Sequence, residues 1–291
     1  MFVDTHCHLN LMARQQTGEQ PMDDIPLTQE QLAAIAPIVD AAAQENVNTI
    51  LTIGTTLTES RNSITIAQQH PSVWAVVGLH PNDCTTDWRN AFASIKNLVA
   101  DKEKNKLVGI GETGLDYYWP NYHKQHQRDA FKAHIELALA HDLALVIHLR
   151  PSKPSLTHEL TLSTPDSAQD ELFELLLPYK NQITRGIMHC FSHDNAFAQT
   201  ALEWGFVLGI GGVITYPKNE SLRDIIRTIP LEKLVLETDA PFLAPQIARG
   251  KQNHPKYIAI IAQFLADLKG VNLHEVATQT TATAQRIFGT P

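Results

Sequence analysis

The chain has 291 residues, 43% of them hydrophobic, which suits either two ordinary domains or one α/β barrel. A formal net charge of −8 argues against a broad basic surface for duplex nucleic acid, although metal ions could still hold a phosphate substrate locally. Three widely spaced cysteines (Cys7, Cys84 and Cys190) without a C-x-x-C pattern indicate neither a disulfide framework nor a zinc ribbon. We expect a reducing, cytoplasmic compartment from this cysteine usage, and the sequence also shows no signal-peptide pattern and no membrane segment.

Short apolar runs recur along the chain and alternate with helical patterns. They cover residues 2–5, 49–53, 73–79, 107–110, 143–147, 184–188, 206–210 and 234–236. This alternation predicts repeated βα units with right-handed crossovers, and therefore a parallel sheet. Eight units in a chain of this length favour a single-domain (β/α)8 TIM barrel over residues 1–291, rather than an open doubly wound sheet.

Helix signals lie between these runs. Residues 28–31 resemble a capping box, and Pro37 should kink or interrupt the helix that follows. Amphipathic patterns predict helices over 88–99, 126–141 and 258–268, and Asn272 can cap a last helix. The histidines His126, His134 and His141 in the second of these patterns fit helix surface or packing better than a ligand role.

Two segments look like loop insertions, near residues 10–27 and 151–167. The first is polar and irregular, and the second is rich in proline, serine and threonine. Both follow the C-terminal end of a strand. We therefore expect both on the face where barrel enzymes build their active sites.

The first apolar run leads directly into His6-Cys7-His8. Because side chains alternate along a strand, His6 and His8 should point to one side and Cys7 to the other. Two imidazoles on one side of a strand end can reach one metal ion. The alternative is two polar residues where a strand becomes a loop.

Imidazole or carboxylate groups also follow five later runs: His80, Glu112, His148, His189 and Asp239. In a barrel, the C-terminal ends of the strands meet at one face, so these groups should lie close together. Each has another explanation when taken alone, since His148 could be a hydrogen-bonded core histidine and Asp239 a helix cap. Their joint occurrence predicts a metal site.

The mixture of ligands fits hydrolytic chemistry with divalent ions. Zinc, manganese and magnesium accept imidazole nitrogen and carboxylate oxygen, and a hydrolytic centre leaves positions open for water and substrate. Glu112 lies between the two histidine sets in strand order, so its oxygens could bridge two ions that clamp a phosphoryl displacement. Asp239 could ligate one ion and accept the proton of the attacking water. Arg150 shares a face with His148 and suits a phosphate, with a salt bridge at the barrel rim as the alternative.

For other residues near these strand ends, we either predict a structural role or leave two roles open. Cys190 and Glu237 should face away from the centre, Cys190 into packing and Glu237 towards the helices. Glycines 209, 211 and 212 could expose N–H groups to an anion or form a tight turn. The aromatic residues near the mouth could stack on bases or pack within loops, and they are Tyr117, Tyr118, Trp119, Tyr122, Phe191 and Tyr216.

At these positions the chain resembles the TatD family of metal-dependent deoxyribonucleases, within the amidohydrolase-like superfamily. The matching motifs are Asp4-Thr5-His6-Cys7-His8-Leu9, Gly78-Leu79-His80-Pro81, Gly111-Glu112-Thr113-Gly114-Leu115-Asp116-Tyr117-Tyr118, His148-Leu149-Arg150, His189-Cys190-Phe191-Ser192 and Leu236-Glu237-Thr238-Asp239-Ala240-Pro241. They follow one another in the expected order, so the resemblance covers nearly the whole chain.

The resemblance implies a TIM barrel with two divalent metal ions, with Mg or Mn favoured and Zn possible. One ion would be held by His6, His8, Glu112 and Asp239, and the other by Glu112, His148 and His189. His80 would contact the substrate. One departure is the stretch Gly250-Lys251-Gln252-Asn253-His254-Pro255, which has Gln252 and His254 where the family often has arginine and glutamate.

Together these observations predict a metal-dependent phosphodiesterase, a 3′→5′ exonuclease that hydrolyses single-stranded DNA or RNA ends with a water activated by two metal ions. The alternative is a small-molecule hydrolase on the same barrel, cleaving a phosphoester, lactone or amide. Related barrels of that kind often use a carboxylated lysine where this chain has Glu112, which favours the nuclease. A non-catalytic metal-binding protein would be expected to have lost a ligand. We expect no membrane association and no obligate protein partner.

Overall fold

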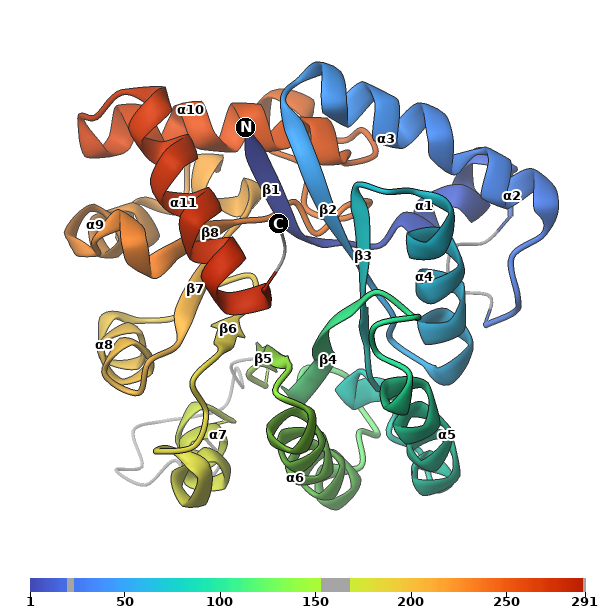
Figure 1. The fold of residues 1–291 in the computed structure, drawn as a ribbon. Coiled ribbons are helices and arrows are strands. Elements are labelled where there is room, and N and C mark those ends of the chain that lie inside the picture. Colours follow the sequence, from blue (N-terminus) through green and yellow to red (C-terminus); the bar gives the residue numbers. More distant parts are fainter. Residues whose placement is uncertain (20–23, 153–167, 290–291) are drawn as a thin grey trace.

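The computed structural model describes residues 1–19, 24–152 and 168–289, and within these ranges the strands form one eight-stranded sheet (Figure 1). The strands are β1 (Phe2–Cys7), β2 (Val47–Ile53), β3 (Val73–Val77), β4 (Leu107–Asp116), β5 (Ala144–Arg150), β6 (Gly186–Met188), β7 (Val207–Ile210) and β8 (Leu234–Leu236). They are ordered β1 to β8, and each is parallel to the next. A parallel bridge between Cys7 and Ala240 brings the two edges together, so the sheet is a nearly closed barrel. The predicted (β/α)8 barrel with a single domain is confirmed.

Helices lie between successive strands and surround the barrel (Figure 1). The α-helices are α1 (Leu9–Gln16), α2 (Gln29–Ala33), α3 (Ile35–Gln44), α4 (Leu57–Gln69), α5 (Trp88–Ala100), α6 (Lys124–His141), α7 (Ala168–Leu176), α8 (Asn195–Glu203), α9 (Glu220–Thr228), α10 (Ile258–Lys269) and α11 (Leu273–Phe288). Short 3-10 helices are η1 (Pro81–Asp83), η2 (Leu177–Tyr179), η3 (Gly212–Thr215), η4 (Leu231–Lys233), η5 (Gln246–Ala248) and η6 (Pro255–Tyr257).

The apolar core has two parts, one on each side of the sheet. Inside the barrel, β-branched side chains such as Val3, Val76, Val146 and Val235 pack together, and the end of α11 contributes Phe288 to the same cluster. The larger part lies between the strands and the surrounding helices. Burial on both sides explains why the strands read as nearly continuous apolar runs in the sequence.

The predicted helix signals are confirmed. Thr28 and Gln31 form a capping box at the start of α2, and the helical path breaks at Ala34, shortly before Pro37. The side chain of Asn272 accepts a hydrogen bond from the backbone N–H of Glu275 and caps α11. At the start of both helices, a polar side chain accepts a hydrogen bond from a backbone N–H of the first turn, and this fixes where the helix begins.

The prediction of an irregular segment over residues 10–27 is wrong in its first part. Residues 9–16 form α1, in which Met12 is buried and the guanidinium of Arg14 pairs with Glu59 at 2.6 Å. The sequence does not show the amphipathic pattern of α1, because Arg14 occupies a buried position that is ordinarily apolar. The second predicted insertion, 151–167, falls largely outside the described residues.

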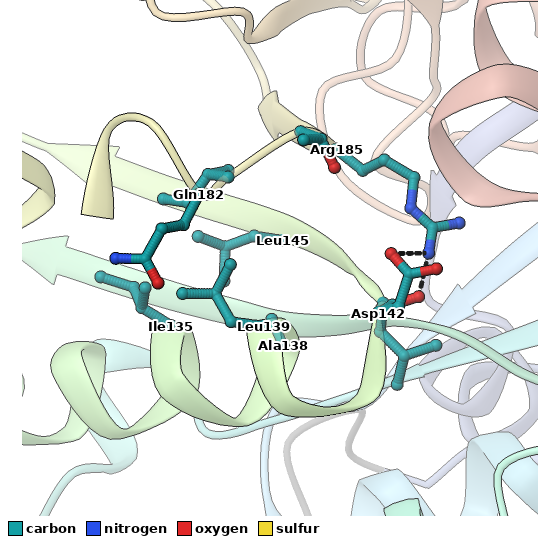
Figure 2. A pocket seen from close by; sticks show the side chains of 10 residues that line it. Ile135, Ala138, Leu139, Asp142, Leu145, Gln182 and Arg185 are labelled. Carbon is teal, nitrogen blue, oxygen red and sulfur yellow. Dashed lines mark hydrogen bonds and ion pairs between the residues drawn. The ribbon is translucent and has the colours of Figure 1, made fainter.

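A small pocket of about 60 Å³ lies between α6, β5 and the segment before β6 (Figure 2). Ile135, Leu139 and Leu145 line it, and an ion pair of 2.6 Å between Arg185 and Asp142 closes one side. Its volume admits only a few water molecules, so we assign it to packing. Among the described residues, no helix combines the length and the apolar character needed to cross a lipid bilayer.

Candidate metal centre

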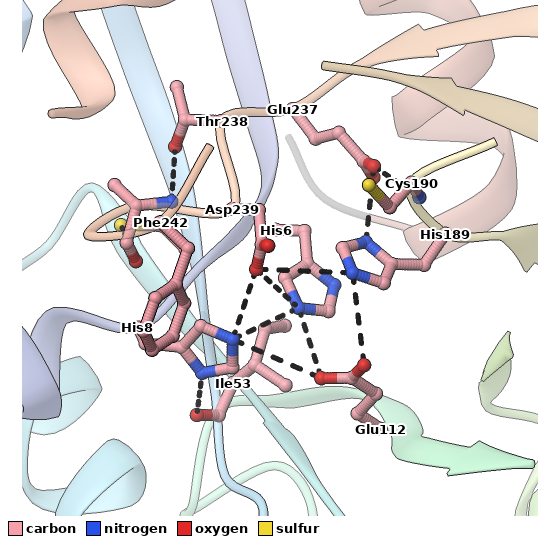
Figure 3. A network of polar contacts seen from close by, with 12 residues as sticks. His6, His8, Ile53, Glu112, His189, Cys190, Glu237, Thr238, Asp239 and Phe242 are labelled. Carbon is pink, nitrogen blue, oxygen red and sulfur yellow. Dashed lines mark hydrogen bonds and ion pairs between the residues drawn. The ribbon is translucent and has the colours of Figure 1, made fainter. Parts of the chain in front are cut away.

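Four side chains from three separated segments meet at the C-terminal end of the barrel (Figure 3). The Nε2 atoms of His6 and His8 lie 3.3 Å apart, which confirms that both face the same side. Glu112 Oε2 lies 3.3 Å from His6 Nε2, and Asp239 Oδ1 lies 3.3 Å from His8 Nε2. Cys7 points the other way and is buried with its Sγ 3.9 Å from the sulfur of Met12, as predicted.

The second oxygen of Glu112 faces a different pair of histidines. Glu112 Oε1 lies 2.6 Å from His148 Nδ1 and 3.8 Å from His189 Nε2. His189 also connects the two groups, because its Nε2 lies 3.9 Å from Asp239 Oδ1. One oxygen of Glu112 therefore lies beside His6, and the other lies near His148 and His189.

This donor set fits divalent metal ions. Ligand atoms arranged tetrahedrally around an ion at about 2.1 Å lie about 3.4 Å from one another. The three separations of 3.3 Å among His6, His8, Glu112 and Asp239 are close to this value. His8 Nδ1 lies 3.2 Å from Ile53 O and donates to this carbonyl, so a neutral His8 presents a lone pair at Nε2, the atom that faces the cluster. The residues present could therefore hold metal ions.

Two carboxylates outside the set of candidate ligands, Glu237 and Asp116, contact the second ring nitrogen of His189 and of His148. Glu237 Oε1 lies 3.1 Å from His189 Nδ1, and Asp116 Oδ2 lies 3.4 Å from His148 Nε2. Such contacts select the ring orientation and tautomer and raise the basicity of the nitrogen that faces the metal. Gly209 provides the space for Glu237, because a Cβ there would lie 2.3 Å from Glu237 Oε2. The prediction that Glu237 points towards the helices is wrong, and the role of Asp116 was not predicted.

The charges of the cluster shift the pKa values of its members. Burial alone would raise the pKa of Glu112, but His189 and His148 outweigh it and hold this pKa well below its usual range. Burial disfavours charge on both histidines, yet Glu237 and Glu112 raise the pKa of His189 to about 10, and Glu112 and Asp116 raise the pKa of His148 to about 9. For Asp239, burial is outweighed by His8 and the pKa is lowered. Glu112 and Asp239 are therefore ionised at neutral pH and favour cations beside them.

Asp4 connects the first strand to the loop that carries Asp239. The buried carboxylate accepts hydrogen bonds from Thr238 N at 2.9 Å, from Thr238 Oγ1 at 2.6 Å and from His6 N at 3.3 Å. The backbone N–H of Asp239 in turn donates to His6 O at 2.8 Å. These bonds set the position of Asp239 relative to the two histidines of β1.

His80 lies beside the centre, as the sequence predicts. Its Nε2 is 3.9 Å from Glu112 Oε1, and its Nδ1 accepts the backbone N–H of Asn82 at 3.1 Å. Because Nδ1 is an acceptor, a neutral His80 carries its proton on Nε2, the atom that faces the centre. His134 supports this loop by accepting the N–H of Leu79 at 3.0 Å, which agrees with the structural interpretation of His134.

Arg150 follows His148 on β5 and stacks on Tyr118, with its guanidinium carbon 3.6 Å from the ring centroid. Among the described residues, no carboxylate forms a salt bridge with Arg150. The alternative of a rim salt bridge is therefore not supported there, and the edge of the guanidinium can face a ligand.

Near the mouth, Cys190 lies differently from the prediction, and two of the aromatic residues take the packing alternative. Cys190 has a left-handed backbone, with φ of 48°, and its Sγ lies within 4.8 Å of ligand atoms of His189 and Asp239, so it does not face away. Tyr117 and Phe191 are only 3% and 1% exposed and cannot stack on a substrate.

The substituted segment 250–255 does not provide a group to the cluster. Gln252 Nε2 contacts Gln15 Oε1 of α1 at 2.5 Å, and His254 Nδ1 accepts the N–H of Lys256 and caps η6. Gln252 and His254 therefore contact residues of the segments around the centre, and neither contacts a candidate ligand.

A family model described as "TatD related DNase" matches residues 3–289 of this chain. The chain belongs to the TatD family. A metal-dependent hydrolase of Bacillus subtilis, YabD, is 30% identical over 288 residues, covering 99% of each chain. The TatD protein of Citrobacter rodentium, named a 3′-5′ ssDNA/RNA exonuclease, is 31% identical over 257 residues, covering 87% of this chain and 90% of its own.

Among solved structures, the TatD homologue YJJV of Escherichia coli K12 matches with a TM-score of 0.82 and 24% identity, over 100% of this chain and 98% of that one. At this identity the match supports the fold alone. Family membership and the relatives make this TatD-family chain a metal-dependent hydrolase that acts on ester bonds.

Proposed function

We propose that this protein is a two-metal phosphodiesterase that shortens single-stranded DNA, and also RNA, from the 3′ end. The observation that carries the proposal is the position of Glu112, whose Oε2 faces His6 and whose Oε1 faces His148. A carboxylate so placed can bridge two ions, and paired ions suit the displacement of one oxygen by another at phosphorus. The name of the Citrobacter relative supports a nucleic-acid substrate. We further propose Mg²⁺ or Mn²⁺ as the cations and the cytoplasm as the location.

The ligands divide into two sets. His6, His8, Glu112 and Asp239 would hold one ion, and Glu112, His148 and His189 the other. When bound, the ions would neutralise charge on the phosphoryl group and lower the pKa of the attacking water.

The other groups of the site act on the proton and on the phosphate. The side chain of Asp239 is 15% exposed, compared with 5% for Glu112, so Asp239 is the carboxylate that can accept the proton of the attacking water. The Nε2–H of His80 can donate to a phosphoryl oxygen. Arg150, oriented by Tyr118, can bind two oxygens of one phosphate through the edge of its guanidinium.

The experiment begins with protein stripped of metal and reloaded separately with Mg²⁺, Mn²⁺ or Zn²⁺. Each form is incubated with single-stranded DNA and RNA labelled at the 5′ end, and in parallel with small phosphodiesters, lactones and amides. We expect stepwise shortening from the 3′ end with at least one of these cations. Turnover of a small ester without shortening of any oligonucleotide would contradict the proposal and favour a small-molecule hydrolase.

Two variants test the assignment of the ligands. Glu112→Gln and His148→Ala should abolish turnover while thermal unfolding remains cooperative. His274→Ala is the matched control, because His274 lies exposed on α11, and it should retain full activity. Full activity in either ligand variant would refute the two-metal assignment.

A further inference from the structure

The loop that follows β8 exposes a large apolar side chain at the edge of the metal centre. Phe242 is 40% exposed, and its ring meets the ring of His8 edge-on with 6.0 Å between the centroids (Figure 3). Leu243 beside it is 39% exposed. Exposed apolar surface is unfavourable in water, by about 25 cal/mol per Å². A flat apolar face next to a hydrolytic centre is a suitable contact for a planar ligand.

Hydrogen bonds hold the backbone of Phe242 at a defined place relative to Asp239. The Nδ2 of Asn253 donates to Thr238 O at 2.7 Å and to Phe242 O at 2.5 Å, and Phe242 N donates to Asp239 O at 2.8 Å. The loop also packs closely on the segment after β7, since a Cβ on Gly212 would lie 2.4 Å from Leu243 O. Such a preorganised face loses little conformational entropy when a ligand stacks on it.

A cation lies on the same loop. The guanidinium carbon of Arg249 is 4.2 Å from the ring centroid of Tyr216, whose hydroxyl donates to Ala244 O at 2.9 Å. In the described parts of the chain, no carboxylate forms an ion pair with Arg249. A guanidinium stacked by its face keeps its N–H edge available for phosphate oxygens.

We propose that Phe242 and Arg249 form a nucleotide subsite next to the metal centre, an inference that rests on the proposed function. Phe242 stacks on a base of the single strand, and Arg249 binds a phosphate of the same strand. The ring face is complementary to any base, so the subsite selects for a base-bearing single strand and against a small ester, and not for a sequence.

The test compares two substrates with the metal-loaded enzyme. One is an oligodeoxythymidine of about ten nucleotides, and the other is an abasic oligomer of the same length, in which sugars and phosphates remain but bases are absent. Phe242→Ala should raise KM for the base-bearing oligomer about five-fold or more and leave KM for the abasic oligomer nearly unchanged. Phe242→Trp should restore the preference for bases. Equal increases for both substrates would show that Phe242 only supports His8, and would overturn the stacking role.

Arg249→Ala should raise KM for both oligomers, because both carry phosphates. It should also reduce the slope of log affinity against log salt concentration by about 0.7, the value for one phosphate contact on a single strand. An unchanged slope would overturn the phosphate contact. Ile247→Ala is the matched control, an exposed apolar residue of η5, and should behave as wild type in both assays.

Failure of the subsite is distinguishable from failure of the proposed function. A wild-type enzyme that hydrolyses bis(4-nitrophenyl) phosphate but neither oligomer would refute the nuclease proposal together with the subsite. A wild-type enzyme that shortens oligomers, with variants that match it on both substrates, would refute the subsite alone.

Discussion

Replacing Glu237 by glutamine tests whether the outer carboxylates tune the metal centre. Glu237 is fully buried, and its Oε1 accepts the N–H of Cys190 and lies 3.1 Å from His189 Nδ1. The amide oxygen of glutamine can accept the same two hydrogen bonds in nearly the same volume. Glu237→Gln therefore removes the negative charge behind His189 and leaves the packing in place.

The expected effect on metal affinity follows from the buried contact. Loss of a carboxylate that hydrogen-bonds a ligating histidine weakens metal binding about 10- to 100-fold, or about 1.4–2.8 kcal/mol. Glu237→Ala should do more, because it leaves two buried donors unpaired at about 1–3 kcal/mol each. We therefore expect weaker metal binding in both variants, and an additional loss of unfolding free energy of about 2–6 kcal/mol in the alanine variant alone.

The assay is competition between the protein and a chromophoric chelator for Mn²⁺ and Zn²⁺, with urea unfolding in parallel. Glu136→Gln is the matched control, since Glu136 is an exposed glutamate of α6 that accepts from the hydroxyl of Tyr179 at 2.9 Å. Wild-type metal affinity in Glu237→Gln would refute the argument that charge behind His189 contributes to binding.

Three further predictions concern pH, metal removal and phosphate recognition. Burial lowers the pKa of His134 to about 4, so the unfolded chain takes up this proton at a higher pH than the folded chain. The contribution of neutral His134 to the unfolding free energy is therefore complete above about pH 6.5 and declines as the pH falls towards 4. Wild type should lose about 1 kcal/mol more unfolding free energy than His134→Gln between about pH 7.5 and about pH 5.5 in urea titrations, and equal losses would contradict this. Removing bound metal with a chelator should lower the unfolding free energy by about 2.7 kcal/mol relative to protein with free metal at a hundred times Kd, and an unchanged Tm would contradict the site. Arg150→Lys should raise KM for oligonucleotides more than it changes kcat, because lysine cannot bind a phosphate through two parallel N–H groups, and an unaltered KM in steady-state assays would exclude that contact.

The sequence predicts the barrel and the meeting of the candidate ligands because both depend on short-range patterns. Each of the eight apolar runs contains or overlaps a strand of the sheet. Since parallel strands of a barrel end on one face, residues that follow those runs, such as His6, Glu112 and Asp239, must approach one another. Their role as ligands remains a prediction that metal-binding measurements must test.

The two errors of direction have different causes. β6 ends at Met188, so the period-two alternation no longer applies to Cys190. Glu237 continues the alternation of β8 and shares the inner side of the barrel with Val235, so the prediction assigned it to the wrong side. Left-handed backbone at Cys190 and Asp239, with φ of 48° and 57°, then redirects these side chains. Turn conformations of this kind depend on tertiary contacts that a local pattern does not contain.

Asp116 and Phe242 were missed for different reasons. β4 continues through two glycines to Asp116, and these glycines break the apolar run that indicates a strand. Phe242 looks like any other apolar residue of a loop, and its 40% exposure is decided by the packing of the complete barrel. Residues 111–116 read Gly-Glu-Thr-Gly-Leu-Asp, with Leu115 as the single apolar side chain, so no local apolar pattern extends β4 to Asp116.

The candidate metal centre lies where the barrel closes, and this couples its assembly to the fold. Asp4 in β1 binds Thr238 across a sequence separation of 234 residues, and backbone hydrogen bonds join Asp239 to His6 and His8 to Ala240. No fragment that lacks the segment after β8 can bring Asp239 to the histidines of β1. Because a cation held by both edges binds the closed barrel better than the open one, metal affinity should report closure directly. A chain truncated before residue 238 should therefore lose metal binding at the His6 and His8 pair even if its remaining βα units stay compact.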